Sequence, residues 1–151
     1  MSASVRWFEH RDAPDLLCLY ESVWRWCEEV EVSTEFIVKS SQRPDFRYLV
    51  AEDEGTVVGF CGALYFKAVG RAEYGPVAVA EGYRGAGVGS KLTDAMLGFL
   101  CENGVKRVVA KVKHSNDSAK SFFIKKGFSY EAYLRRYTLK AEDIVQMVRY
   151  L

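Results

Sequence analysis

The chain has 151 residues, a length that fits one domain, so we expect residues 1–151 to fold as a single domain. Apolar residues make up 49% of it, which is ample for a packed core and excludes an intrinsically disordered chain. The 21 basic and 20 acidic residues nearly cancel, so neither nucleic acid nor an anionic membrane is favoured as a partner, and a small ligand is expected instead.

The cysteines and histidines offer no framework for a metal or for disulfides. The four cysteines contain no C-x-x-C pair, and His10 and His114 are the only histidines. Each cysteine stands in an apolar context, so we expect buried, reduced thiols rather than a catalytic nucleophile. Residues 1–11 contain no apolar leader, and no apolar run approaches the roughly 20 residues of a membrane span. A cytoplasmic location is therefore expected.

The first half of the chain predicts two helices and four strands. Asp12 and Pro14 supply a start signal for a helix that runs to about residue 23, and Ser33 or Thr34 caps a second helix. The acidic cluster between these helices, Glu28, Glu29 and Glu31, is typical of a solvated face, with a contact to a cationic amine as the alternative. Alternating apolar residues predict strands, two of them joined by a hairpin turn at 53–55, over residues 5–9, 48–52, 57–66 and 73–80.

The second half predicts a βαβ unit. Apolar residues recur at helical spacing over 88–103 and stop at Gly104, and a strand follows over 105–114. That strand and the one at 73–80 flank a helix, so we expect them to run parallel. Next come a helix over 117–126 and two strands, the last of which also fits a helical period, over 128–139 and 144–151. The order indicates a mixed α/β (α+β) sheet with helices on its faces.

A glycine-rich loop leads from the strand at 73–80 into the helix. Gly85, Gly87 and Gly89 let backbone N–H groups converge, and the helix start adds partial positive charge, so the loop is suited to a phosphate. The Walker pattern fails because Val88 stands where its lysine belongs. The dinucleotide pattern G-x-G-x-x-G fails because Ser90 stands where its third glycine belongs. ATP and dinucleotides are thereby disfavoured as ligands.

The segment Arg84-x-x-Gly87-x-Gly89 resembles the R/Q-x-x-G-x-G/A signature of the GNAT N-acetyltransferase superfamily, and Asn116-x-x-Ala119 with Gly127-Phe128 resembles its second signature segment. The resemblance implies a GNAT-like acyl-CoA N-acyltransferase fold, with a twisted, mostly antiparallel sheet around one parallel βαβ unit. It also implies acetyl-CoA as co-substrate, no metal, and loop amides that hold the pyrophosphate. The implied cofactor-binding residues are Val77, Val79, Arg84, Gly85, Ala86, Gly87, Val88, Gly89, Ser90, Asn116, Ala119, Phe122 and Phe123.

Acetyl transfer to an amine requires a base, because an alkylammonium with a pKa of about 10 must first lose a proton. Glu73 is the first candidate, since it begins the strand leading into the loop and the resemblance supports it; an ordinary strand-end carboxylate is the alternative. His114, expected to point into the cleft between the parallel strands, is the second, with a structural histidine as the alternative. Pro76 predicts a strand break that frees the Val77 amide for the thioester carbonyl oxygen.

One position departs from the family pattern. Where many relatives carry a tyrosine thought to protonate the departing thiolate, this chain has Phe123, and Tyr130, Tyr133 or Tyr137 would have to substitute. We therefore expect an acetyl-CoA-dependent N-acetyltransferase that acts on a primary amine, a small molecule or a peptide, in a direct ternary complex. A non-catalytic acyl-CoA sensor and a nucleotide-binding regulator are the alternatives. The resemblance implies that residues 24–46 build the acceptor site, and exposed sheet edges are compatible with a homodimer.

Overall fold

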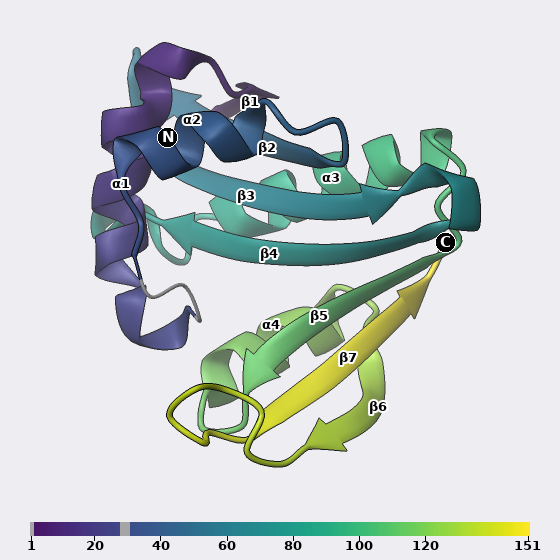
Figure 1. Ribbon diagram of the computed structural model, residues 1–151. Coiled ribbons are helices and arrows are strands. Elements are labelled where there is room, and N and C mark those ends of the chain that lie inside the picture. The colour runs from purple at the N-terminus through teal and green to yellow at the C-terminus, as the bar shows by residue number, and fades with distance from the viewer. Residues whose placement is uncertain (1, 28–30) are drawn as a thin grey trace.

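The computed structural model describes residues 2–27 and 31–151 and shows one sheet with helices on both faces (Figure 1). The strands are β1 (Ser4–Trp7), β2 (Phe46–Asp53), β3 (Thr56–Phe66), β4 (Arg71–Val79), β5 (Arg107–Lys113), β6 (Ser129–Leu134) and β7 (Ile144–Tyr150). The α-helices are α1 (Ala13–Ser22), α2 (Thr34–Ser41), α3 (Val88–Glu102) and α4 (Asp117–Lys125). This arrangement confirms the predicted mixed α/β sheet.

The strand order creates an opening in the middle of the sheet. Neighbours follow the order β1-β2-β3-β4-β5-β7-β6, and the β4–β5 pair is parallel while the other pairs are antiparallel. The parallel pairing covers only residues 71–73 beside residues 107–109. Beyond Glu73 the two strands separate, while β5 stays paired with β7 as far as Lys113. Figure 1 shows the V-shaped gap that results.

Two hydrophobic clusters pack the helices onto the two faces of the sheet. On one face α3 packs on the sheet through Leu92, Met96 and Leu100, which are fully buried. On the other face α1 and α2 pack through Leu16 and Ile37, which are also fully buried. Each such side chain stabilises the fold by roughly 1.5–3 kcal/mol through burial. The α3 cluster includes buried residues of both β4 and β5, among them Ala72 and Val108, and so connects the two strands that border the gap.

The C-terminal strands differ from expectation at one end. β7 is a strand and not a helix, because it pairs with β5 on one side and with β6 on the other. β6 ends at Leu134 and not at residue 139. The chain turns there because Arg136 adopts φ 50° and donates its N–H to the Asp143 carboxylate at 2.9 Å. Residues 135–143 consequently form a loop beside the open end of β5.

The expectation of buried cysteines is wrong for two of the four. Cys61 is buried and Cys27 is partly buried, but Cys18 and Cys101 are exposed, because neither shares a helix face with its buried neighbour. Burial raises the pKa of the Cys61 thiol to about 12, so that thiol stays protonated. Within residues 2–27 and 31–151, no three His, Cys, Asp or Glu side chains are placed to hold a metal, and no helix has the length and apolar character needed to cross a membrane.

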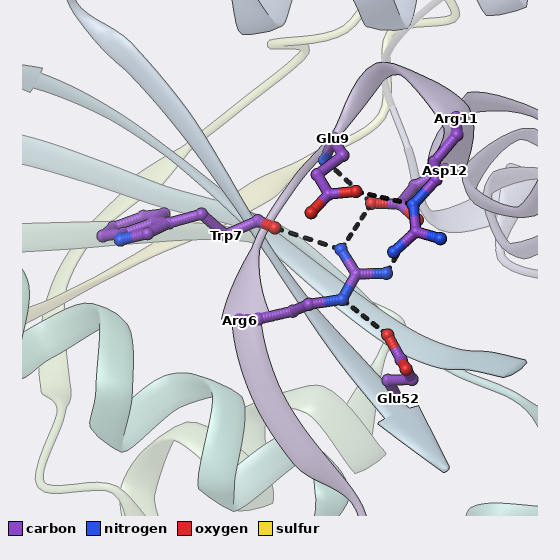
Figure 2. Close-up of polar contacts among 6 residues, drawn as sticks. All are labelled: Arg6, Trp7, Glu9, Arg11, Asp12 and Glu52. Carbon is purple, nitrogen blue, oxygen red and sulfur yellow. Dashed lines mark hydrogen bonds and ion pairs between the residues drawn. The ribbon is translucent and has the colours of Figure 1, made fainter. Parts of the chain in front are cut away.

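An ion-pair network fixes the N-terminal strand to the rest of the sheet (Figure 2). Arg6 donates two hydrogen bonds to the Asp12 carboxylate, at 2.8 and 2.9 Å, and a third from Nε to Glu52 at 2.5 Å. The Glu9 N–H also donates to Asp12, at 2.8 Å. Burial by itself would raise the pKa of Asp12, but the hydrogen bonds from Arg6 and Glu9 outweigh it and hold that pKa below its ordinary value.

Asp12→Asn should destabilise the fold by about 2–3 kcal/mol at pH 7, because a neutral amide would face the partly buried Arg6 guanidinium. Since the folded-state pKa is the lower one, the stabilisation is complete above the unfolded-state value of about 3.9 and is lost as pH falls through the folded-state value. Urea unfolding should show that the difference in unfolding free energy between the wild type and Asp12→Asn is smaller at pH 3 than at pH 7. Arg11→Gln, which breaks an exposed pair, should cost less than about 1 kcal/mol. An equal difference between the wild type and Asp12→Asn at both pH values would contradict this account.

Candidate functional site

A cleft of about 930 Å³ occupies the gap between β4 and β5. It is lined by the second half of β4, the loop that follows, the first turn of α3, the inner side of α4 and the end of β5. Each residue predicted to contact a cofactor lines this cleft except Ala86, whose N–H donates to the Tyr83 carbonyl at 3.4 Å. The volume lies in the upper part of the range of roughly 300–1,000 Å³ that is typical of ligand sites.

A bulge in β4 turns backbone amides into the cleft. The β3–β4 register shifts between Cys61 and Ala63, opposite the cis peptide bond that joins Gly75 and Pro76, as Pro76 predicted. After the bulge, the Ala80 N–H donates to Val58 of β3 at 2.8 Å. Successive N–H groups of a strand point in opposite directions, so the amides of Val77 and Val79 point away from β3, toward the cleft.

The loop after β4 forms a second set of inward-facing amides. Gly87 is the N-cap of α3 and has φ 82°, a left-handed conformation that a residue with a Cβ rarely adopts. The first N–H groups of a helix have no intrahelical acceptor, so those of Val88, Gly89 and Ser90 point out of the start of α3. Together with the positive end of the helix dipole, they make a binding site for an anion such as a phosphate.

Two predicted ligand contacts also serve as caps. Arg84 donates from Nε to the carbonyl of Val79 at 3.2 Å, which folds its exposed side chain back over the end of β4. Asn116 accepts the Ala119 N–H at 3.2 Å and thereby caps α4. The capping roles named as alternatives are thus present, while both residues still line the cleft.

The wall of the cleft formed by α4 is aromatic. Phe123 is buried and meets the Tyr74 ring edge-on, with 6.1 Å between ring centroids. The Tyr74 hydroxyl is hydrogen-bonded to Thr93 of α3 at 2.9 Å, and burial raises its pKa well above the ordinary tyrosine value. Neither ring therefore presents an acidic hydroxyl to the cleft. Of the proposed substitutes, Tyr130 and Tyr133 are exposed on β6, and Tyr137 is half-exposed in the loop beyond it.

The two predicted bases lie in different places. Glu73 is at the last parallel pair of β4 and β5, and its carboxylate is 2.9 Å from Nζ of Lys111. It lines a second cavity, of about 340 Å³, that adjoins the first. His114 lines neither cavity. Its backbone N–H donates to the Asp143 carbonyl at 3.0 Å, and its exposed ring packs edge-on against Tyr133. The expected orientation of His114 into the cleft is therefore not observed.

Two lysines of β5 complete the site, and the sequence analysis missed both. Lys111 lines both cavities; burial opposes its charge, but hydrogen bonds to Tyr137 and Glu73 outweigh that and leave its pKa raised. Lys113 is buried, donates to the Arg25 carbonyl at 2.6 Å and lies 3.1 Å from Glu142. It thus ties the 3₁₀ turn at Trp24–Trp26 across the open end of the V. The sequence signal that could have revealed them is a pair of lysines that alternate with apolar residues within one strand.

Comparison with known proteins gives one consistent result. Residues 13–128 match the Acetyltransferase (GNAT) family. N-alpha-acetyltransferase 30 of Schizosaccharomyces pombe is 28% identical over 115 residues, which are 72% of this chain and 74% of that protein. The crystal structure of Ard1 from Thermoplasma volcanium has a TM-score of 0.86 at 26% identity, covering 100% of this chain and 99% of its own.

A third neighbour carries a ligand. The structure of yncA, described as a putative acetyltransferase from Salmonella typhimurium with its cofactor acetyl-CoA, superposes with a TM-score of 0.86 at 19% identity, over 100% of this chain and 95% of that one. At this identity the likeness concerns the fold alone. The family match, in contrast, spans most of the chain, including the glycine loop and α4. The chain belongs to the GNAT acetyltransferase family.

Proposed function

We propose that this chain transfers the acetyl group of acetyl-CoA directly to a primary amine within a ternary complex. The observation that carries the proposal is the continuous cleft that joins the phosphate-binding start of α3 to the amides of Val77 and Val79. A diphosphate at one end and a thioester carbonyl at the other match these two sets of donors. The fit is one of donor chemistry, because each set offers N–H groups to oxygen atoms.

Each part of the cleft has a task in this scheme. The amides of Val88, Gly89 and Ser90 hold the pyrophosphate, and the aromatic wall at Phe122 and Phe123 excludes water from the thioester. Acetyl-CoA supplies an activated acyl group. The Val77 amide stabilises the carbonyl oxygen as it gains negative charge, which is worth several kcal/mol in sites of this kind. The nitrogen–carbon bond forms, the carbon–sulfur bond breaks, and the thiolate leaves without a tyrosine donor.

Glu73 is the base in this proposal, and His114 is the second candidate. Glu73 lines the second cavity and directly precedes residues 74–76, which line both cavities and include the β4 bulge. Its carboxylate takes the proton of the attacking amine directly or through a water. An α-amine is favoured over a lysine side chain, because its pKa of about 7.7–8.0 leaves far more of it neutral than a pKa of about 10.4 does. The similarity to a protein named as an N-alpha-acetyltransferase supports the same choice.

A non-catalytic acyl-CoA sensor is the second candidate function. It is favoured by the buried Phe123, which leaves the thiolate without an obvious proton donor. A cytoplasmic location and a homodimer stay predictions.

Calorimetry followed by turnover separates these readings. We expect acetyl-CoA to bind at micromolar concentrations, ATP not to compete with it, and free thiol to appear when a peptide with an unblocked N-terminus is added. Cys27→Ser should keep this turnover, since transfer is direct and needs no acetylated cysteine. Binding without thiol release across a broad amine panel would favour the sensor, and absence of binding would refute the proposal.

A further inference from the structure

The second cavity, of about 340 Å³, lies on the face of the sheet covered by α1 and α2, and none of residues 77–90 lines it. Its lining is dominated by rings and aliphatic groups, from Tyr20, Trp26, Phe36, Phe46, Tyr48, Leu64 and Pro76. Apart from Trp26, which lies in the 3₁₀ turn Trp24–Trp26, these residues come from α1, α2, β2, β3 and β4, all of which belong to the packed layers described above. The cavity is therefore a built feature of the fold.

The part of this cavity that is lined by Tyr20, Phe46 and Tyr48 is apolar although two of these residues are tyrosines. The hydroxyls of Tyr20 and Tyr48 are hydrogen-bonded to each other at 2.9 Å, and both residues are buried. Phe46 packs edge-on against Tyr48, with 4.7 Å between ring centroids. Phe36 lies at the rim, where it is 37% exposed. A ligand group that enters here meets ring faces and edges, which favours an apolar group.

The charges in the lining are already paired. Glu73 is held by Lys111 at 2.9 Å, and the Arg43 guanidinium makes two hydrogen bonds to Asp45 at 2.9 and 3.0 Å. Among the described lining residues, Glu73 is the single carboxylate. Within the described lining, an acceptor with a second cationic group finds no unpaired carboxylate, because Glu73 is already held by Lys111.

The cavity opens onto the position where transfer takes place. Both cavities are lined by Trp26, Cys27, Lys111 and residues 74–76, which include the β4 bulge. An amine held by Glu73 therefore stands in the second cavity, next to residues 74–76 that both cavities share. A group attached to the carbon next to that nitrogen then contacts the rings of Phe46 and Tyr48, which line the same cavity. Resting on the proposed transfer to an amine, we propose that the second cavity binds an apolar side group carried next to the acceptor nitrogen.

The preferred acceptors are then primary amines with an apolar group of the size of a leucine, methionine or phenylalanine side chain. The test is a series of peptides that differ only in the first residue, assayed by thiol release at a fixed acetyl-CoA concentration. Leu, Met or Phe should give a kcat/KM about 10- to 100-fold above that for Gly, Ser or Glu. Leucine amide and 2-phenylethylamine, run alongside, distinguish a peptide source of the group from a small amine.

Two substitutions change the cavity in opposite ways. In Gly62→Ala the new Cβ would lie 2.7 Å from Cζ of Phe46, so that ring, which lines the cavity, must shift from its position. The kcat/KM for a peptide that begins with Phe or Leu should fall about tenfold, whereas the kcat/KM for a peptide that begins with Ala should stay unchanged. Phe46→Ala should remove the preference for apolar groups by a similar factor. Phe66→Ala, at the exposed end of β3, is the matched control and should keep the wild-type preference.

The outcomes separate this proposal from the acetyltransferase activity on which it depends. A first-residue profile that is flat, or that favours Gly, Ser or Glu while thiol release proceeds, overturns the apolar subsite and leaves the activity intact. Equal losses for all acceptors in Phe46→Ala, with acetyl-CoA affinity and melting temperature unchanged, overturn it as well. Should Gly62→Ala fail to fold, the peptide series and Phe46→Ala decide the matter by themselves.

Discussion

Glu73→Gln should lower kcat/KM for amine acetylation by about 100- to 1,000-fold, because an amide of the same shape cannot accept the proton of the attacking amine. The affinity for acetyl-CoA should stay within about twofold, since Glu73 lines the second cavity and not the cleft proposed to hold the donor. Thiol-release kinetics with a Leu-initiated peptide, together with calorimetry on the same samples, measure both quantities.

His114→Ala is the decisive comparison. The ring of His114 is exposed and lines neither cavity, so its removal should change kcat/KM by less than about threefold over the whole pH range. A large loss in His114→Ala with Glu73→Gln unaffected would exchange the roles of the two residues. Full activity in both variants would mean that the proton leaves through water without either side chain.

The lining of the cleft between β4 and β5 is the part of the candidate site that can be read from the sequence, since each residue expected to contact a cofactor, except Ala86, lines it. This lining is encoded locally, since the spacing of Gly85, Gly87 and Gly89 after a strand dictates where backbone amides converge. Pro76 predicts the bulge in the same direct way, because it cannot donate within a sheet ladder. These features depend on the backbone conformation of consecutive residues, so no long-range contact has to be known in advance.

The acceptor side could not be predicted because it depends on contacts between distant segments. Lys111 meets Glu73 only through the parallel register of β4 and β5, and Trp26 reaches the cleft only because Lys113 holds the Arg25 carbonyl. The alternation of side-chain directions along a strand predicts that His114 points into the cleft. It fails because β5 ends at Lys113 and the backbone N–H of His114 then donates to the Asp143 carbonyl. That end in turn depends on residues 135–143, where positive φ angles fall on residues other than glycine.

Gly87→Val should raise the Kd for acetyl-CoA by about 100-fold, roughly the contribution of one or two hydrogen bonds to a charged group together with the strain of a left-handed valine. Gly87 has φ 82° and opens α3, so a β-branched residue there must shift the amides of Val88 and Gly89 away from the pyrophosphate. Calorimetry measures the change, and 3′-dephospho-CoA should show the same fractional loss, because the effect concerns the diphosphate.

Gly104→Val provides the matched control for that result. Gly104 has φ 80°, and a Cβ at this position would have no neighbouring atom within 4 Å. Valine there therefore brings the same backbone strain at the other end of α3, far from the cleft. Both variants should lose similar stability in urea unfolding, whereas only Gly87→Val should lose affinity. If the two lose affinity equally, the loss comes from general destabilisation of α3, and the amides at its start do not hold the diphosphate.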